Sequence, residues 1–179
     1  MIRAAFVAAC LCAPLAASAQ PVPGPDGYRM GNYRAPVPDS LRGAEVIGAD
    51  EAHELWQSGA AFVDVLPRAP KPENLPEGTL WHETPRQSIP GGVWLPNTGY
   101  GAIDEETAAY FRRGLEVVTG GDKDRPLVIF CLAECWMSWN AAKRALELGY
   151  ARVHWMPGGT DAWIAAGYPT QAVTPEAVR

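Results

Sequence analysis

The chain has 179 residues, of which 47% are hydrophobic, and a formal net charge of −5 at pH 7. This length and apolar content suit one domain with a buried core. The acidic balance provides no basic surface for nucleic acid, so we expect no nucleic-acid partner.

Residues 1–19 are typical of a secretory signal peptide. Arg3 precedes an apolar stretch, Ala4–Leu15, that is too short to span a bilayer. The small residues Ala17–Ala19 form a cleavage pattern before Gln20, and no stop-transfer flank follows. We therefore expect cleavage near Ala19 and Gln20, and a periplasmic protein without a membrane span.

The four cysteines divide between this leader and the rest of the chain. Cys10 and Cys12 lie in the predicted signal peptide, and Cys131 and Cys135 remain after cleavage. A lipoprotein signal ending at Cys10 is the alternative, but it would have a very short apolar segment. Two cysteines are too few for a disulfide scaffold, although an exported protein can form a disulfide between them.

Residues 20–41 are rich in proline, tyrosine and arginine. Such prolines favour extended backbone, and Gly27-Tyr28-Arg29 is echoed by Asn32-Tyr33-Arg34. The segment is either a linker or an extended arm that lies on the domain, because tyrosine rings are costly to leave in water.

Residues 42–172 alternate between strand and helix patterns, and residues 173–179 form a C-terminal tail. Strands are predicted over 44–47, 61–66, 93–95, 127–130 and 153–156, and helices over 50–56, 104–115, 141–146 and 161–166. A proline-rich insertion covers 67–90. This order predicts an α/β fold, a parallel sheet of about five strands with helices on both faces.

The second cysteine pair follows the most apolar predicted strand. Leu127–Phe130 shows no alternation, which is typical of a strand buried on both faces. Ligand sites of parallel sheets lie beyond the carboxyl ends of the strands. Chain order alone therefore places Cys131 at the expected site.

The motifs along this region resemble those of the rhodanese-like family. They are Asp64-Val65, Ile89–Gly92, Cys131 after the buried strand, Ala141-Ala142, Gly149-Tyr150, Gly158-Gly159, Ala162-Trp163 and Ala166–Pro169. The stretches 33–38, 88–101 and 131–142 further resemble an exported subfamily that is associated with catabolism dependent on pyrroloquinoline quinone (PQQ) and named for a CXXCW motif. Here three residues, not two, separate the cysteines.

The resemblance implies a sulfurtransferase in which Cys131 is the nucleophile. The loop that would surround its sulfur comprises Leu132, Ala133, Glu134, Trp136, Met137 and Ser138. Backbone N–H groups and the positive end of the following helix would favour the thiolate, which could carry sulfur as a cysteine persulfide. A small sulfur donor would be the substrate.

The loop departs from the family pattern in its charge. Glu134 stands where glycine is common, and no arginine occurs between Cys131 and Ser138. An anion such as thiosulfate or phosphate thus lacks its usual partner, which makes phosphatase chemistry improbable. Arg86 or His82 of the insertion are the positive side chains that could replace it.

Cys135 is a second departure and leaves several interpretations open. It could resolve an oxidised Cys131 as a disulfide, or exchange with a thiol-redox partner protein. It could also form a disulfide that only tightens the loop. A thioredoxin-like motif has one residue fewer between its cysteines. A haem-attachment motif has a histidine after its second cysteine, where this chain has Trp136, so neither motif fits. Three scattered histidines predict no metal site.

Other side chains near the loop have structural and functional interpretations. Trp136 and Trp139 either pack in the core or line a pocket for a flat quinone. Asp64 is expected to make a structural hydrogen bond, and Lys143 and Arg144 to lie on a solvated helix face.

Two hypotheses follow from these residues. The first is a periplasmic sulfurtransferase or thiol-redox enzyme that uses Cys131 with Cys135. The second is an inactive rhodanese fold that serves a PQQ-dependent alcohol dehydrogenase system as a carrier or adaptor. The cysteine at the nucleophile position favours the first, and the missing loop arginine favours the second.

Overall fold

A computed structural model describes residues 24–80 and 84–177. The predicted signal peptide, with Cys10 and Cys12, lies outside these ranges, as does His82. In the described part of the chain, no helix is long and apolar enough to cross a membrane.

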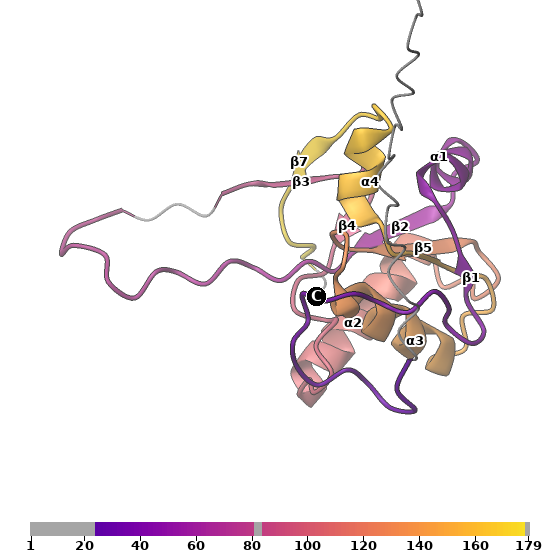
Figure 1. Ribbon diagram of the computed structural model, residues 1–179, viewed down its shortest axis with the longest axis horizontal. Helices are drawn as coiled ribbons and strands as arrows, with labels where there is room; N and C mark the ends of the chain where they lie inside the picture. The colour runs from indigo at the N-terminus through magenta and orange to yellow at the C-terminus, as the bar shows by residue number, and fades with distance from the viewer. Residues whose placement is uncertain (1–23, 81–83, 178–179) are drawn as a thin grey trace, which may run out of the picture.

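Five parallel strands form the central sheet, which confirms the predicted α/β architecture (Figure 1). In spatial order they are β1 (Glu45–Val46), β6 (Val153–Met156), β5 (Leu127–Phe130), β2 (Ala61–Asp64) and β4 (Val93–Trp94). β5 is the middle strand, and all of its residues are buried. Phe130 of β5 pairs with Asp64 on one side and with Met156 on the other. The residue after β5 therefore emerges at the centre of the sheet's carboxyl edge.

Four helices cover the two faces of this sheet. α1 (Ala49–Gln57) and α4 (Gly159–Ala165) pack over one face, and α2 (Glu105–Thr119) and α3 (Trp136–Glu147) over the other (Figure 1). Asp104 caps α2 by accepting a hydrogen bond from the Thr107 N–H at 2.7 Å, and Gly120 ends the helix in the left-handed conformation.

A second, two-stranded sheet was not predicted. β3 (Arg86–Ser88) and β7 (Gln171–Val173) pair antiparallel, although β3 lies in the predicted insertion and β7 reaches the predicted tail. Both strands are short and largely polar, so they carry no periodic pattern. Residues 67–80, before β3, project from the domain as an extended loop (Figure 1).

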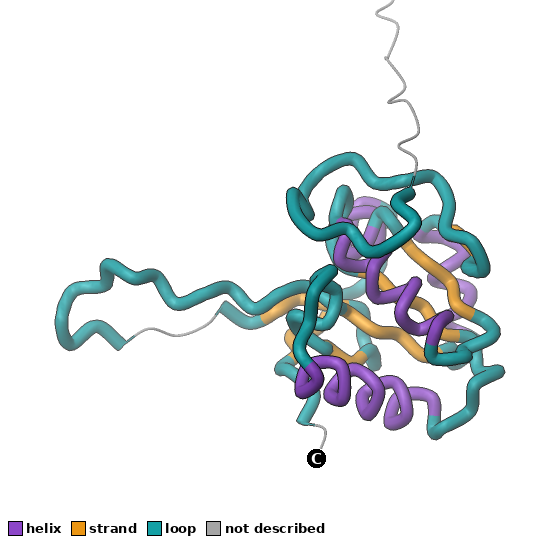
Figure 2. The backbone as a smooth tube through the Cα atoms, turned by 90° about the horizontal axis from the view of Figure 1, so that it is seen from below, coloured by secondary structure: helices purple, strands orange, loops and turns teal. Residues whose placement is uncertain are grey.

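Residues 24–41 fold back on the domain as an arm without helix or strand (Figure 2). Leu41 of the arm belongs to the core cluster, and the arm residues Tyr33, Ala35 and Val37 pack against that cluster. The Asn140 side chain of α3 accepts a hydrogen bond from the Arg29 N–H at 2.9 Å and donates one to the Arg29 carbonyl at 3.0 Å. This segment is therefore a packed arm, not a free linker.

The prediction of a solvated helix face was wrong for Arg144. Its side chain is buried and donates hydrogen bonds to the carbonyls of Thr98, at 2.7 Å, and Tyr100, at 3.1 Å. The guanidinium also lies 4.4 Å from the centre of the Tyr28 ring, so it ties α3 to the arm. A helical pattern cannot reveal such partners from distant loops.

Candidate functional site

The two cysteines mark the ends of one short loop. Cys131 directly follows β5, and Cys135 is the N-cap residue of α3. Between them, Glu134 is exposed and has a φ of +51°, in the left-handed region that favours glycine. This backbone shape explains why glycine suits the position in similar loops, and why a non-glycine residue there carries some strain.

The arm pairs with this loop as an antiparallel bridge between Arg34 and Cys135. The Ala35 N–H donates to the Glu134 carbonyl at 3.2 Å, and the Trp136 N–H donates to the Tyr33 carbonyl at 2.9 Å. The first N–H of α3 is therefore satisfied by the arm. Sequence reasoning missed this contact because nothing in a polyproline-like segment specifies its partner.

Arg34 brings a positive charge to the loop. Its guanidinium donates a hydrogen bond to the Ala133 carbonyl at 2.8 Å, across 99 positions in the chain. Sequence analysis pointed to Arg86 and His82 instead, and the one signal for Arg34 was its place in a repeated Tyr-Arg pair.

The floor of the loop is a buried polar network around Asp64. The carboxylate accepts hydrogen bonds from Arg86 Nε and Ser88 Oγ, both at 2.7 Å, and from the Leu66 N–H at 2.9 Å. Arg86 also donates to Thr160 Oγ1 at 3.0 Å and to the Cys131 carbonyl at 3.4 Å. Arg86, one of the two possible charge partners named from the sequence, thus contacts the loop from beneath and is the ion-pair partner of Asp64.

Burial and these hydrogen-bond partners shift the pKa of the Asp64 carboxyl in opposite directions. Burial raises the pKa of Asp64, while the Arg86 guanidinium and the Leu66 N–H oppose that rise. We regard the close ion pair as the decisive feature, because an unpaired buried guanidinium would be costly. The structural role predicted for Asp64 agrees with this network.

Both cysteines are free thiols and both are buried, with exposed fractions of 0% for Cys131 and 1% for Cys135. Burial raises the pKa of the Cys131 thiol well above its ordinary value, and its hydrogen bond to Cys135 adds to that rise. The same hydrogen bond is the main cause that lowers the pKa of Cys135 to about 6. The two thiols therefore titrate as one pair whose pKa values shift in opposite directions.

The remaining residues of the predicted loop are mainly structural. Met137 is buried, and Ser138 Oγ donates to the Cys135 carbonyl at 2.9 Å and accepts from Trp155 Nε1 at 3.0 Å. Leu132 and Ala133 are half-buried. Gly159 of α4 lies so close that a Cβ there would be 2.4 Å from the Cys131 carbonyl oxygen, which explains the glycine.

The two tryptophans pack and do not form a quinone slot. Their rings meet edge to face at 5.6 Å, and both are buried. Trp136 donates to the Pro36 carbonyl at 3.0 Å, and Trp139 to the Ser40 carbonyl at 3.3 Å. A cavity of about 490 Å³ borders Trp139 farther along α3, but neither cysteine lines it. These residues therefore do not fit a flat cofactor at the loop.

No cluster of three or more histidine, cysteine or acidic side chains suited to a metal occurs among the described residues. The site consists instead of two thiols, a covering arm and a buried ion pair.

The model of the rhodanese-like domain family matches residues 49–166, which include both cysteines and four of the five central strands. The chain belongs to the rhodanese-like domain family. No curated protein matches the chain. Membership in the family gives the fold and does not by itself establish the reaction.

Solved structures share the rhodanese fold at low sequence identity. The chain is similar to YnjE, with 17% identity and a TM-score of 0.52, over 75% of this chain and 32% of that one. It is also similar to the homodimeric polysulfide-sulfur transferase of Wolinella succinogenes, with 16% identity and a TM-score of 0.48, over 75% and 83% of the two chains. For the rhodanese-like domain of Alr3790 from Anabaena the identity is 15%, the TM-score 0.44, and the coverage 78% and 89%.

Proposed function

We propose that this protein is a rhodanese-type sulfurtransferase or thiol-redox protein that acts through Cys131 and Cys135. The observation that carries the proposal is a pair of free, buried thiols in one loop at the carboxyl end of the central strand, and the opposed shifts of their pKa values support it. Thiols with perturbed pKa values are typical of reactive sites.

Sulfur transfer from thiosulfate would take two displacements. A cysteine thiolate attacks the sulfane sulfur, a new S–S bond forms, and the donor's S–S bond breaks as sulfite leaves with the electron pair. An acceptor thiolate or cyanide then attacks the outer sulfur of the persulfide and releases the cysteine thiolate. No net oxidation of the protein occurs.

The second cysteine allows a competing reaction of the persulfide. It can attack the inner sulfur of the persulfide, which forms the Cys131–Cys135 disulfide and expels hydrosulfide with the electron pair. The protein is then oxidised by two electrons, and a dithiol partner protein would have to reduce it. The pair thus supports either persulfide delivery or a thiol–disulfide cycle.

Burial of both sulfurs supports a second candidate, an inactive rhodanese fold that serves as a carrier or adaptor. We propose a periplasmic location from the signal-peptide pattern of residues 1–19. A link to PQQ-dependent alcohol oxidation, through a quinoprotein dehydrogenase system, rests on the subfamily resemblance of residues 131–142 and is proposed on that basis alone.

The test is turnover with purified protein. We expect thiocyanate from thiosulfate or polysulfide with cyanide, or sulfide release when a dithiol is the acceptor, and loss of either activity in Cys131→Ser and Cys135→Ser variants. The matched control is Ser58→Ala, which removes an exposed hydroxyl at the end of α1 and keeps both thiols. Absence of turnover with every donor, together with a quinoprotein that co-purifies from the periplasm, would favour the adaptor.

A further inference from the structure

The middle of the cysteine loop is held from two sides by opposite charges. The Ala133 N–H donates to the Asp161 carboxylate of α4 at 3.0 Å, and the Ala133 carbonyl accepts from the Arg34 guanidinium of the arm at 2.8 Å. A negatively charged ligand at this loop is therefore repelled on the side of α4 and attracted on the side of the arm.

Among the described residues, three arginines contact the loop or the tryptophan that follows it. Arg86 lies beneath the loop, 2.7 Å from the Asp64 carboxylate that pairs with it. The Arg29 guanidinium lies 4.9 Å from the centre of the Trp136 ring and donates to a carbonyl two residues farther along the chain. Arg34 is exposed, and the partner of its guanidinium within the described ranges is an uncharged carbonyl. Its further N–H donors and its charge are therefore available to a ligand.

The main chain of the arm fixes this charge beside the two thiols. Arg34 forms the antiparallel bridge with Cys135, and a hydrogen bond on either side of the bridge joins the arm to the loop. The preceding Tyr33 is anchored as well, because its ring meets that of Tyr100 edge to face at 5.3 Å and its hydroxyl accepts from the Gly101 N–H at 3.1 Å. Little further ordering of the arm is thus needed when a ligand binds Arg34.

We propose that the arm makes this site selective for anionic sulfur donors, and that Arg34 binds the negative end of the donor while its transferable sulfur meets the cysteine pair. This names the substrate class of the proposed function and rests on it. Thiosulfate and polysulfide belong to the class, and an uncharged trisulfide does not. As the S–S bond of thiosulfate breaks, negative charge grows on the leaving sulfite, and the same guanidinium stabilises it.

Arg34 is then a specificity-determining residue that comes from outside residues 49–166, which match the family model. The loop between the cysteines carries no arginine of its own, and the guanidinium of the arm supplies the planar set of donors that suits an oxyanion.

Two exposed carboxylates limit this selectivity. Glu134 belongs to the loop, and Asp161 binds the loop from α4. A third carboxylate, that of Asp64, is buried and compensated by Arg86. Close to a protein surface at physiological salt, one unit charge changes the local concentration of an anion about three- to tenfold. Removing Arg34 should therefore reduce the preference for anions by about this factor.

The first experiment compares two thiol reagents of similar size that differ in charge, the anion iodoacetate and the neutral iodoacetamide. The readout is the ratio of their rate constants with the reduced protein, because burial of the thiols and changes of their pKa affect both reagents alike. We expect Arg34→Gln to lower the ratio of the anionic to the neutral rate about three- to tenfold and Arg34→Lys to preserve it.

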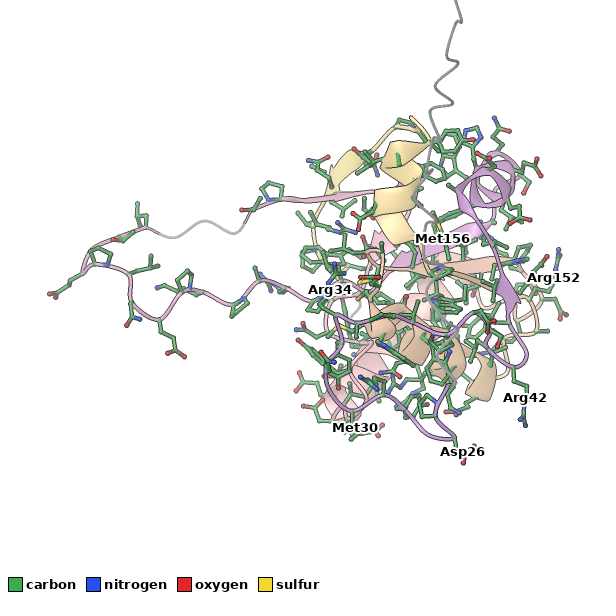
Figure 3. The ribbon with its side chains drawn as sticks, viewed as in Figure 1. Asp26, Met30, Arg34, Arg42, Arg152 and Met156 are labelled. Atoms are coloured by element: carbon green, nitrogen blue, oxygen red, sulfur yellow. The ribbon has the colours of Figure 1, made fainter. Side chains whose placement is uncertain are left out.

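Arg42→Gln is the matched control, because it removes the same charge from an exposed residue on the other side of the domain (Figure 3). It should leave the ratio unchanged. An unchanged ratio in Arg34→Gln, an equal fall in Arg42→Gln or a fall that Arg34→Lys fails to prevent would overturn the proposal. Thiols that react with neither reagent until urea unfolds the protein would also overturn it, since no donor could then reach them.

The second experiment measures turnover with cyanide as the acceptor and two donors, thiosulfate and the uncharged dimethyl trisulfide. In Arg34→Gln, kcat/KM should fall about three- to tenfold for thiosulfate and change little for the trisulfide. Equal falls for both donors would refute a role of Arg34 in selectivity. If neither donor is turned over by wild type, the proposed function fails, while the alkylation ratio still decides whether Arg34 attracts anions to the thiols.

Discussion

The interaction of Cys131 with Cys135 allows a quantitative prediction of the pKa of Cys135 in variants of Cys131. The hydrogen bond from Cys131 is the main cause that lowers the pKa of Cys135 to about 6, from an ordinary value of 9.0. A hydrogen bond to a charged group contributes roughly 1.5–3 kcal/mol, and one pKa unit corresponds to about 1.4 kcal/mol. Because a thiol is a weak donor, removing it should raise the pKa by about one unit.

Two variants at Cys131 separate the hydrogen bond from the second ionisable group. Cys131→Ala removes both, and we expect a midpoint of about 7 for Cys135. Cys131→Ser removes the ionisable thiol but supplies a hydroxyl donor, so its midpoint should stay at about 6. The thiolate fraction at pH 7 would thus be about 90% in Cys131→Ser and about 50% in Cys131→Ala.

The assay is the pH dependence of the Cys135 Cβ chemical shift in each reduced protein. An Ala variant that titrates like wild type would refute the hydrogen-bond argument. Equal rises in the Ala and Ser variants would show that the neighbouring ionisable group, and not the donated proton, controls the charge.

The remaining predictions concern stability. Because the pKa of Cys135 is lowered, its ionisation stabilises the fold fully above pH 9, and this stabilisation is lost as the pH falls through about 6. The free energy of unfolding of wild type, minus that of Cys135→Ser, should therefore rise with pH over this window by at most about 1.4 kcal/mol per pH unit. Urea titrations at several pH values measure this difference. Trp136→Ala should cost about 3–5 kcal/mol by the same titration, since a buried indole and its bond to the arm are lost; a cost below 1 kcal/mol would contradict a packed arm. Asp64→Asn should cost about 3 kcal/mol or more because it leaves Arg86 unpaired, and a double variant with Arg86→Met should recover part of it. Glu134→Gly should leave the melting temperature unchanged or higher, since left-handed strain of about 1 kcal/mol is relieved; clear destabilisation would count against that strain.

The central sheet could be predicted because its signals are local. Leu127–Phe130 is apolar without alternation, and burial on both faces of β5 is the reason. The position of Cys131 then followed from chain order, since the carboxyl ends of parallel strands meet at one edge. Helix starts such as Asp104 were also readable, because the cap residue bonds to the turn that follows it.

The chemistry of the loop depends on contacts that no local pattern encodes. The pairing of Arg34 with Cys135 joins segments about a hundred residues apart, so neither segment's sequence predicts its contact with the other. The opposed pKa shifts of the two thiols likewise depend on their burial, on their hydrogen bond to each other and on the Asp64 carboxylate, which belongs to a different strand. Family position therefore predicted the place of the site but not the contacts that perturb its two thiols.

The most direct test of the dithiol site is the intact mass of the reduced protein after exposure to thiosulfate or polysulfide. We expect wild type to gain the mass of one sulfur atom, which cyanide removes, or to lose two hydrogens, which a reductant restores. The double variant Cys131→Ser with Cys135→Ser should show neither change. A wild-type protein that keeps the mass of an unmodified dithiol with every donor would contradict the account.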